Sequence, residues 1–104
     1  MVSKIGRTPI AIAATGTDFY FYLTHVGVLT RYLLELPDVN TITFTLSLID
    51  ENSKTIWSGA AHAENGSYSV PIDVEIDGKY KVDLTLSNVA GGTGGTAYLT
   101  FWVR

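Results

Sequence analysis

Cysteine is absent from this chain of 104 residues. Its absence excludes disulfide bonds, a thiolate nucleophile and any zinc site built on cysteine ligands. Stability must therefore come from packing. A chain without cysteine fits a protein assembled in a reducing compartment, but its composition leaves the compartment open.

Charged residues are also scarce, because Asp, Glu, Lys and Arg together make up 16% of the chain and the net charge is −3. A protein that holds phosphate backbones needs clustered Lys and Arg, so we expect no nucleic-acid partner. No run approaches the roughly 20 apolar residues of a membrane span, and the apolar stretch 9–14 is too short for a secretion signal. With 46% hydrophobic residues, the chain is expected to fold as one domain without a membrane partner.

Catalytic patterns are missing as well. His62-Ala63-Glu64 matches the His-x-Glu of zinc deaminases, but the cysteines of that site do not exist here. The stretch 91–95 is rich in glycine but lacks the lysine of a phosphate-binding loop, and we interpret it as a hairpin tip. The acidic turn Asp50-Glu51-Asn52 lacks the spacing of a calcium loop. We therefore expect no enzyme activity, no metal and no cofactor.

Hydrophobic residues recur with a period of two from Thr41 onward. In the run 41–48 every even position is apolar and every odd position carries a hydroxyl group, which is typical of a strand with one buried face. The turn-forming residues 50–53 follow, and 54–58 form a short return strand. The pattern predicts a β-hairpin.

The same period continues from Tyr68 to Leu86, after the turn signal Asn65-Gly66. We expect Asp77-Gly78 to divide this run into two strands, because a strand of about twenty residues is unusual in a small domain. Pro71 predicts an edge or a bulge, since it has no amide donor. Asp73, Glu75 and Asp77 fall on one face, where like charges protect a strand edge from aggregation.

The last strand is predicted over 97–103. Ala97, Leu99, Phe101 and Val103 share one face of it, and Tyr98 and Trp102 share the other. Flat aromatic side chains on an outer face can stack on sugar rings or anchor a protein interface. They can equally be covered by another part of the chain.

The N-terminal region is less regular, and we expect it to form an extended arm over residues 1–27. Val28 to Leu36 is read as the first strand of a domain that covers 28–104. Residues 1–31 carry a charge of +2 and the rest of the chain is acidic, so the arm could dock on a neighbouring copy or another subunit. In the alternative, it folds back as an extra strand of its own domain.

Regular short strands with no credible helix predict an all-β fold, a β-sandwich or a small barrel. The segment Asp77-Gly78-Lys79-Tyr80-Lys81-Val82 resembles the Asp-Gly-x-Tyr-x-Val motif of short immunoglobulin-like modules in bacteriophage virion and bacterial surface proteins. This resemblance implies an immunoglobulin-like antiparallel β-sandwich with an extended N-terminal arm. It also implies that the Tyr80 hydroxyl bonds back to nearby backbone.

These patterns lead to the hypothesis of a non-enzymatic structural protein of a bacteriophage virion. It would be a head decoration or cementing protein, assembled in the host cytoplasm, whose partners are other virion subunits or further copies of itself. The alternatives are a carbohydrate-binding or adhesion module and a tail or fibre accessory protein. The residues expected to make the contacts are Ile5, Ile10, Ile12, Phe19, Tyr20, Phe21, Tyr22, Tyr98 and Trp102.

Overall fold

The computed structural model describes residues 2–13 and 16–104, and every regular element in them is a β-strand. The strands are β1 (Ser3–Ile12), β2 (Asp18–Glu35), β3 (Thr43–Ile49), β4 (Thr55–Ser58), β5 (His62–Ala63), β6 (Ser67–Ser87) and β7 (Gly95–Val103). All of their pairings are antiparallel. The prediction of an all-β antiparallel fold is confirmed.

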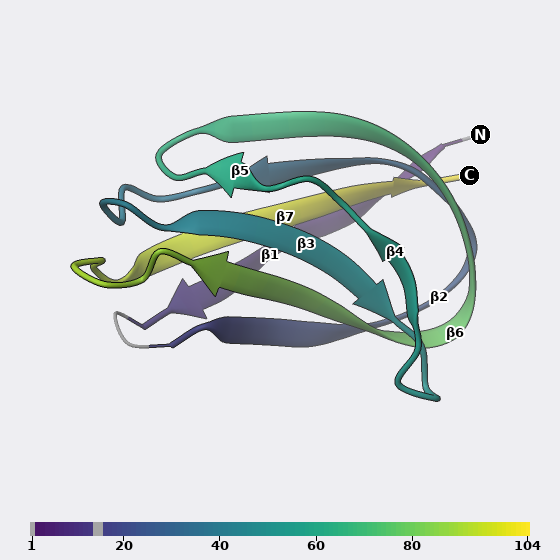
Figure 1. The fold of residues 1–104 in the computed structure, drawn as a ribbon. Helices are drawn as coiled ribbons and strands as arrows, with labels where there is room; N and C mark the ends of the chain where they lie inside the picture. Colours follow the sequence, from purple (N-terminus) through teal and green to yellow (C-terminus); the bar gives the residue numbers. More distant parts are fainter. Residues whose placement is uncertain (1, 14–15) are drawn as a thin grey trace.

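The strands form one sheet in the order β1-β7-β2-β6-β3-β4, and β5 pairs with β3. The long strands β2 and β6 bend together, so the sheet folds over on itself (Figure 1). We call β1, β7 and the adjoining parts of β2 and β6 the first half of the sheet. The second half consists of residues 18–27 of β2, residues 77–87 of β6, and β3, β4 and β5.

Two glycines lie where the β2–β6 ribbon bends. Gly27 has φ 147° and Gly78 has φ 131°, values that side-chain-bearing residues rarely adopt. The two positions are close in register, because His25 pairs with Gly78 and Gly27 pairs with Ile76. The predicted division at Asp77-Gly78 is therefore wrong. Glycine allows both strands to bend without losing their pairing, and β6 continues for 21 residues.

A register shift between Leu29 and Arg31 changes which side chains of β2 face the core. Leu23 and Leu29 are buried before it, and Tyr32 and Leu34 are buried after it. The strand predicted over 28–36 is thus only the C-terminal part of β2. The buried residues fall on odd positions before the shift and on even positions after it, so the sequence of β2 does not show one continuous period of two.

The structure does not confirm an N-terminal arm. β1 lies along β7, from the pair Ser3 and Val103 to the pair Ile12 and Gly95. The two ends of the chain consequently lie side by side (Figure 1). The boundary predicted at Val28 falls inside β2, and the alternative in which this segment folds back onto its own domain is the arrangement found. The physical reason is burial, since β1 contributes two isoleucines to the core.

The core lies between the two halves of the folded sheet. Leu34, Leu99 and Phe101 enter it from the first half, and Phe44 and Leu84 enter it from the second half. Each of these side chains is at most 1% exposed. Burying a side chain of this size contributes roughly 1.5–3 kcal/mol, so the contact between the halves holds the fold together.

The predicted hairpin is confirmed, because β3 and β4 pair on either side of the turn at Asp50. The predicted turn at Asn65-Gly66 is found between β5 and β6, and Asn65 has φ 56°. Pro71 lies beside the register shift of β2, in a part of β6 that pairs on one side only, as predicted. Residues 91–95 do not form a hairpin tip, since β6 and β7 are not neighbours in the sheet.

The Tyr80 side chain makes a local contact that bears on the predicted motif. Its hydroxyl accepts a hydrogen bond from the backbone N–H of Asp77 at 3.1 Å. A contact between this hydroxyl and nearby backbone is what the resemblance to immunoglobulin-like modules implies. The immunoglobulin-like topology itself stays a prediction.

Candidate interaction surface

The outer face of the first half carries an arginine that joins three adjacent strands. Arg7 of β1 lies over the Tyr98 ring of β7, with 3.7 Å from its Cζ to the ring centroid. The same guanidinium donates two hydrogen bonds to the Glu35 carboxylate of β2, at 2.9 and 3.1 Å. The hydrogen bond from Arg7 lowers the pKa of Glu35. These contacts tie the edge strand β1 to the middle of the sheet.

A second arginine covers the other predicted aromatic on this face. Arg31 of β2 lies over the Trp102 ring of β7, with 4.0 Å between its Cζ and the centroid. Tyr98 and Trp102 are both half-buried, and each has one ring face capped by a guanidinium. The expected outward orientation of these residues is correct. The capped faces are closed to stacking on a sugar ring.

The second half carries the more exposed aromatic residues, on the N-terminal part of β2. Tyr20 and Tyr22 are 51% and 56% exposed, and their rings meet edge to face at 5.6 Å. Val26 follows on the same strand and is 72% exposed. In the described part of the chain, only Val2 joins them among the large hydrophobic residues with such exposure.

Two lysines of β6 lie across these tyrosine rings. The Lys81 Nζ is 4.2 Å from the centroid of Tyr20, and the Lys79 Nζ is 4.5 Å from the centroid of Tyr22. Both contacts have the geometry of cation–π pairs. The ammonium groups thereby lie over the tyrosine rings of β2.

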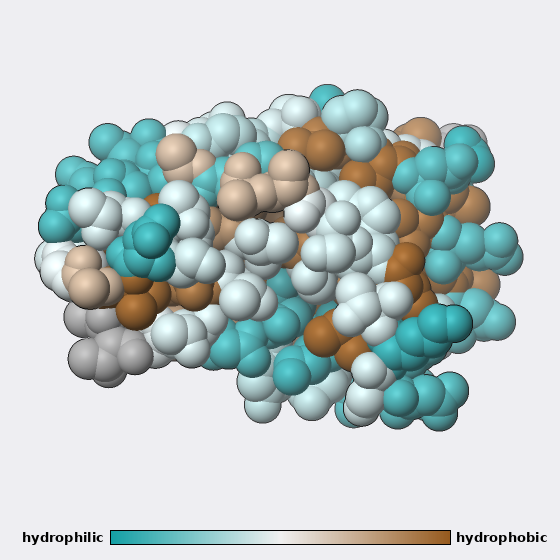
Figure 2. All heavy atoms as spheres, viewed as in Figure 1, coloured by the Kyte–Doolittle hydropathy of each residue, from teal (hydrophilic) through white to brown (hydrophobic). Residues whose placement is uncertain are grey.

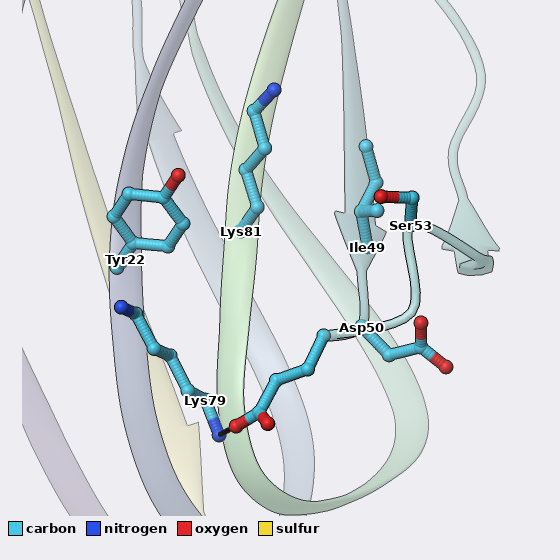
Figure 3. Close-up of a pocket in the computed structure, with 7 residues that line it drawn as sticks. Tyr22, Ile49, Asp50, Ser53, Lys79 and Lys81 are labelled. Carbon is cyan, nitrogen blue, oxygen red and sulfur yellow. Dashed lines mark hydrogen bonds between the residues drawn. The ribbon is translucent and has the colours of Figure 1, made fainter.

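A hollow of about 550 Å³ opens beside Tyr22 (Figure 3). It is lined by Tyr22, Ile49, Asp50, Glu51, Ser53, Lys79 and Lys81. The Asp50 carboxylate accepts hydrogen bonds from the backbone N–H groups of Asn52 and Lys54, both at 2.9 Å, so it is engaged in closing the β3–β4 turn. Glu51 accepts one from the backbone of Lys79 at 3.3 Å. These polar groups maintain the turn, and the lining holds no pair of nucleophile and base.

Asp83 is the buried carboxylate on the outer face of the second half. It is 8% exposed, between Tyr20 of β2 and Ser47 of β3 in the register. Thr85 donates a hydrogen bond to its Oδ2 at 3.4 Å, and its Oδ1 has no partner. Burial, with the nearby carboxylate of Asp18, raises the pKa of Asp83 to about 6.

His62 is part of an aromatic group at the edge of the core. Its Nε2 lies 2.9 Å from the Tyr32 hydroxyl, and its ring stacks on Tyr68 at 4.3 Å. Burial lowers the pKa of His62. Within residues 2–13 and 16–104, no three His, Asp or Glu side chains lie together as metal ligands would. His62 is thus occupied in packing.

The structure distributes the predicted contact residues over three environments. Ile10 and Ile12 are 5% and 4% exposed, so they are core residues and offer no contact surface. Ile5, Phe19 and Phe21 are partly buried against the core. Tyr20 and Tyr22 lie on the surface, as expected for contact residues.

Sequence reasoning missed Val26, Lys79 and Lys81. The alternation from Tyr20 to Val26 carried a signal, since it places these side chains on one face of a strand. The contact of the lysines with the tyrosines depends on the pairing of β2 with β6, which periodicity does not supply.

The surface seen from the side of β3 and β4 is mostly neutral or hydrophilic, and hydrophobic residues form only small groups on it (Figure 2). In the described part of the chain, no helix is long and apolar enough to cross a membrane.

No family model matches the chain, and no curated protein matches it. Nine chains of solved structures do. One of them comes from the structure of the Gt strain of infectious bursal disease virus. It is 13% identical, with a TM-score of 0.46, and the match covers the whole of this chain and 33% of that chain.

A second solved chain comes from the structure of Infectious Bursal Virus Derived T=1 Particles, with 16% identity and a TM-score of 0.45, over 100% of this chain and 31% of that one. A third comes from the crystal structure of the VP2 subviral particle of infectious bursal disease virus. It is 13% identical, with a TM-score of 0.40, and the match covers 100% of this chain and 32% of that chain. The present chain therefore spans about a third of the length of these proteins. Similarity at this level assigns neither a family nor a function.

Proposed function

We propose that this chain is a non-enzymatic structural protein of a bacteriophage virion, a head decoration protein that adds contacts between neighbouring shell subunits. The observation that carries the proposal is the exposed edge of β2, where Tyr20, Tyr22 and Val26 gather on the surface. A cluster of exposed hydrophobic side chains is typical of a protein interface. Repetition over many copies makes even weak contacts effective.

The polar groups of the described surface support a structural role over a catalytic one. The carboxylates of Asp50 and Glu51 are engaged in the β3–β4 turn. His62 is packed between Tyr32 and Tyr68. The exposed residues of β2 offer hydrophobic contact, and the unpaired strand edges offer hydrogen bonds.

The test is binding of the purified chain to shells from its source phage that lack it, measured by co-sedimentation and by the melting temperature of the shells. We expect saturable binding and a higher melting temperature. The triple variant Tyr20→Ser, Tyr22→Ser, Val26→Ser should bind at least about tenfold more weakly, because it removes the hydrophobic contact. Val2→Ser is the matched control, since Val2 is 52% exposed and lies outside β2, just before β1.

Failure of the unmodified chain to bind or stabilise shells would overturn the assignment to the head. Binding to isolated tails or fibres instead would establish the tail accessory function. Binding to a polysaccharide that quenches tryptophan fluorescence would establish the carbohydrate-binding alternative.

A further inference from the structure

Within residues 2–13 and 16–104, the outer edges of β1 and β4 end the sheet, and the long strands β2 and β6 each leave one further stretch of edge without a neighbour. Residues 18–27 of β2 pair only with β6, because β7 joins β2 at Leu29. Residues 67–77 of β6 pair only with β2, because β3 joins β6 at Lys81. Each edge presents unpaired backbone N–H and C=O groups, to which another extended strand can bond.

The edge of β6 is acidic and protected. Asp73, Glu75 and Asp77 are all exposed, and Pro71 precedes them. A proline and a row of like charges are devices that keep a strand edge from pairing with copies of itself. Two such edges side by side would bring three carboxylates against three others.

The edge of β2 has the opposite character. Between residues 18 and 27 it contains no proline, no lysine and no register shift, and Asp18 is its one acidic residue. Its exposed side chains are the tyrosines and Val26, and the ammonium groups of Lys79 and Lys81 lie over the tyrosine rings. The edge is therefore hydrophobic with a basic border.

We infer that the β2 edge of one copy binds the β6 edge of a second copy of this chain as an added antiparallel strand. The carboxylates of Asp73, Glu75 and Asp77 would then lie beside the tyrosines and close to Lys79 and Lys81. Of the three combinations of these edges, this one alone places opposite charges together. Pairing two β6 edges would place one row of carboxylates against another, and pairing two β2 edges would bring four lysines toward one another.

The contact joins different surfaces of the two copies, so each copy keeps one edge of each kind free. Such a head-to-tail contact produces open chains or closed rings and does not stop at a dimer. It also covers Phe19 and Phe21, which lie partly exposed on the inner side of the β2 edge. The inference rests on the proposed structural role and names the neighbouring subunit on the β2 edge as another copy.

The experiment is sedimentation velocity of the full chain in buffer without shells, up to about 1 mM, the range that detects weak association. We expect the average mass to rise continuously with concentration. Raising the salt from about 0.1 M to about 1 M should weaken association at least about tenfold, because it screens the charges between the edges. A chain that stays monomeric at every concentration would overturn the inference.

Charge reversal identifies the two edges. Lys79→Glu with Lys81→Glu changes the β2 border, and Asp73→Lys with Glu75→Lys changes the β6 edge. Each double variant should self-associate at least about tenfold more weakly, and an equal mixture of the two should regain association because opposite charges meet again. The matched controls Lys54→Glu and Asp38→Lys alter exposed charges outside β2 and β6 and should behave as the unmodified chain does.

Two results would contradict this pairing. If the variant with Asp73→Lys and Glu75→Lys still associates fully, the β6 edge takes no part. If the mixture does not regain association while both variants keep the melting behaviour of the native fold, the two edges do not meet. Because shells are absent, these outcomes are independent of binding to the virion.

Discussion

The two outer faces of the folded sheet both place cations on aromatic rings, yet they differ in exposure. Tyr98 and Trp102 lie on β7, between β1 and β2, and both are half-buried. Tyr20 and Tyr22 lie where β2 has a neighbour on one side only, and more than half of each side chain is exposed. The position of the strand in the sheet, more than the type of residue, decides which aromatic residues are available to a partner.

The polar groups of the two faces also differ, in how completely they are hydrogen-bonded. On the first half, Arg7 and Glu35 satisfy each other across three strands. On the second half, the buried Asp83 leaves one carboxylate oxygen without a partner. An unpartnered buried oxygen is a cost to stability, so the second half is built less completely for stability than the first.

The bend that separates the halves offers the largest expected effect, through substitution of its two glycines. Gly27→Ala should destabilise the fold by about 2–4 kcal/mol. A Cβ there would lie 2.8 Å from the Arg104 carbonyl oxygen and 2.9 Å from the Val103 side chain, and the positive φ adds backbone strain. Gly78→Ala should cost only about 1–2 kcal/mol, since its nearest contact is at 3.7 Å. Urea unfolding of both variants measures the difference, and equal losses would show that the close approach at Gly27 does not matter.

Truncation of one aromatic on each face tests the difference in exposure directly. Trp102→Ala should lower the free energy of unfolding by about 2 kcal/mol, because it removes a half-buried ring and its contact with Arg31. Tyr22→Ala should lower it by only about 0.5 kcal/mol, since most of that ring is already in water. Thermal and urea unfolding give both values. A larger loss for Tyr22 would mean that the edge of β2 contributes more to the stability of the monomer than its exposure indicates.

A gain in stability is expected from Asp83→Asn on the second half. Since the pKa of Asp83 is raised to about 6, the folded protein binds this proton more tightly than the unfolded chain. Stability should therefore fall as the pH rises from about 4, the ordinary pKa of Asp, through about 6. In the variant, the free energy of unfolding should no longer depend on pH in this range, and at neutral pH it should be higher by on the order of 1 kcal/mol.

Urea unfolding at a series of pH values measures the effect. Asp73→Asn is the control, because it removes an exposed carboxylate from the same strand. An unchanged profile for Asp83→Asn would show that this carboxylate is better solvated than its burial indicates.

The sequence predicted those parts of the fold that depend on local pattern. The alternation of Thr41 to Leu48 and the turn after it determined the β3–β4 hairpin, and the alternation of 97–103 predicted which face of β7 is buried. These predictions hold because a strand with one buried face has to alternate, whatever strand it pairs with.

The parts that were missed depend on contacts between distant residues. The shift between Leu29 and Arg31 interrupts the period of β2, and a glycine that bends a strand looks in the sequence like one that ends it. Likewise, no local pattern shows that β7 pairs with one part of β2 and leaves the other part free. Two of the nine predicted contact residues, Ile10 and Ile12, are therefore core residues, and Ile5, Phe19 and Phe21 are partly buried against the core.

The long β2–β6 ribbon also has a consequence for the order of folding. Its pairs are nested, from Glu35 with Ser67, which are closest in the sequence, to Asp18 with Thr85, which are farthest apart. Closing a shorter loop costs less entropy, so the ribbon is expected to form first at the Glu35 end and to extend through the bend afterwards. The exposed edge of β2 then forms late, when most of the core is already assembled. A newly synthesised chain would thus form its hydrophobic β2 edge only after the rest of the domain has folded.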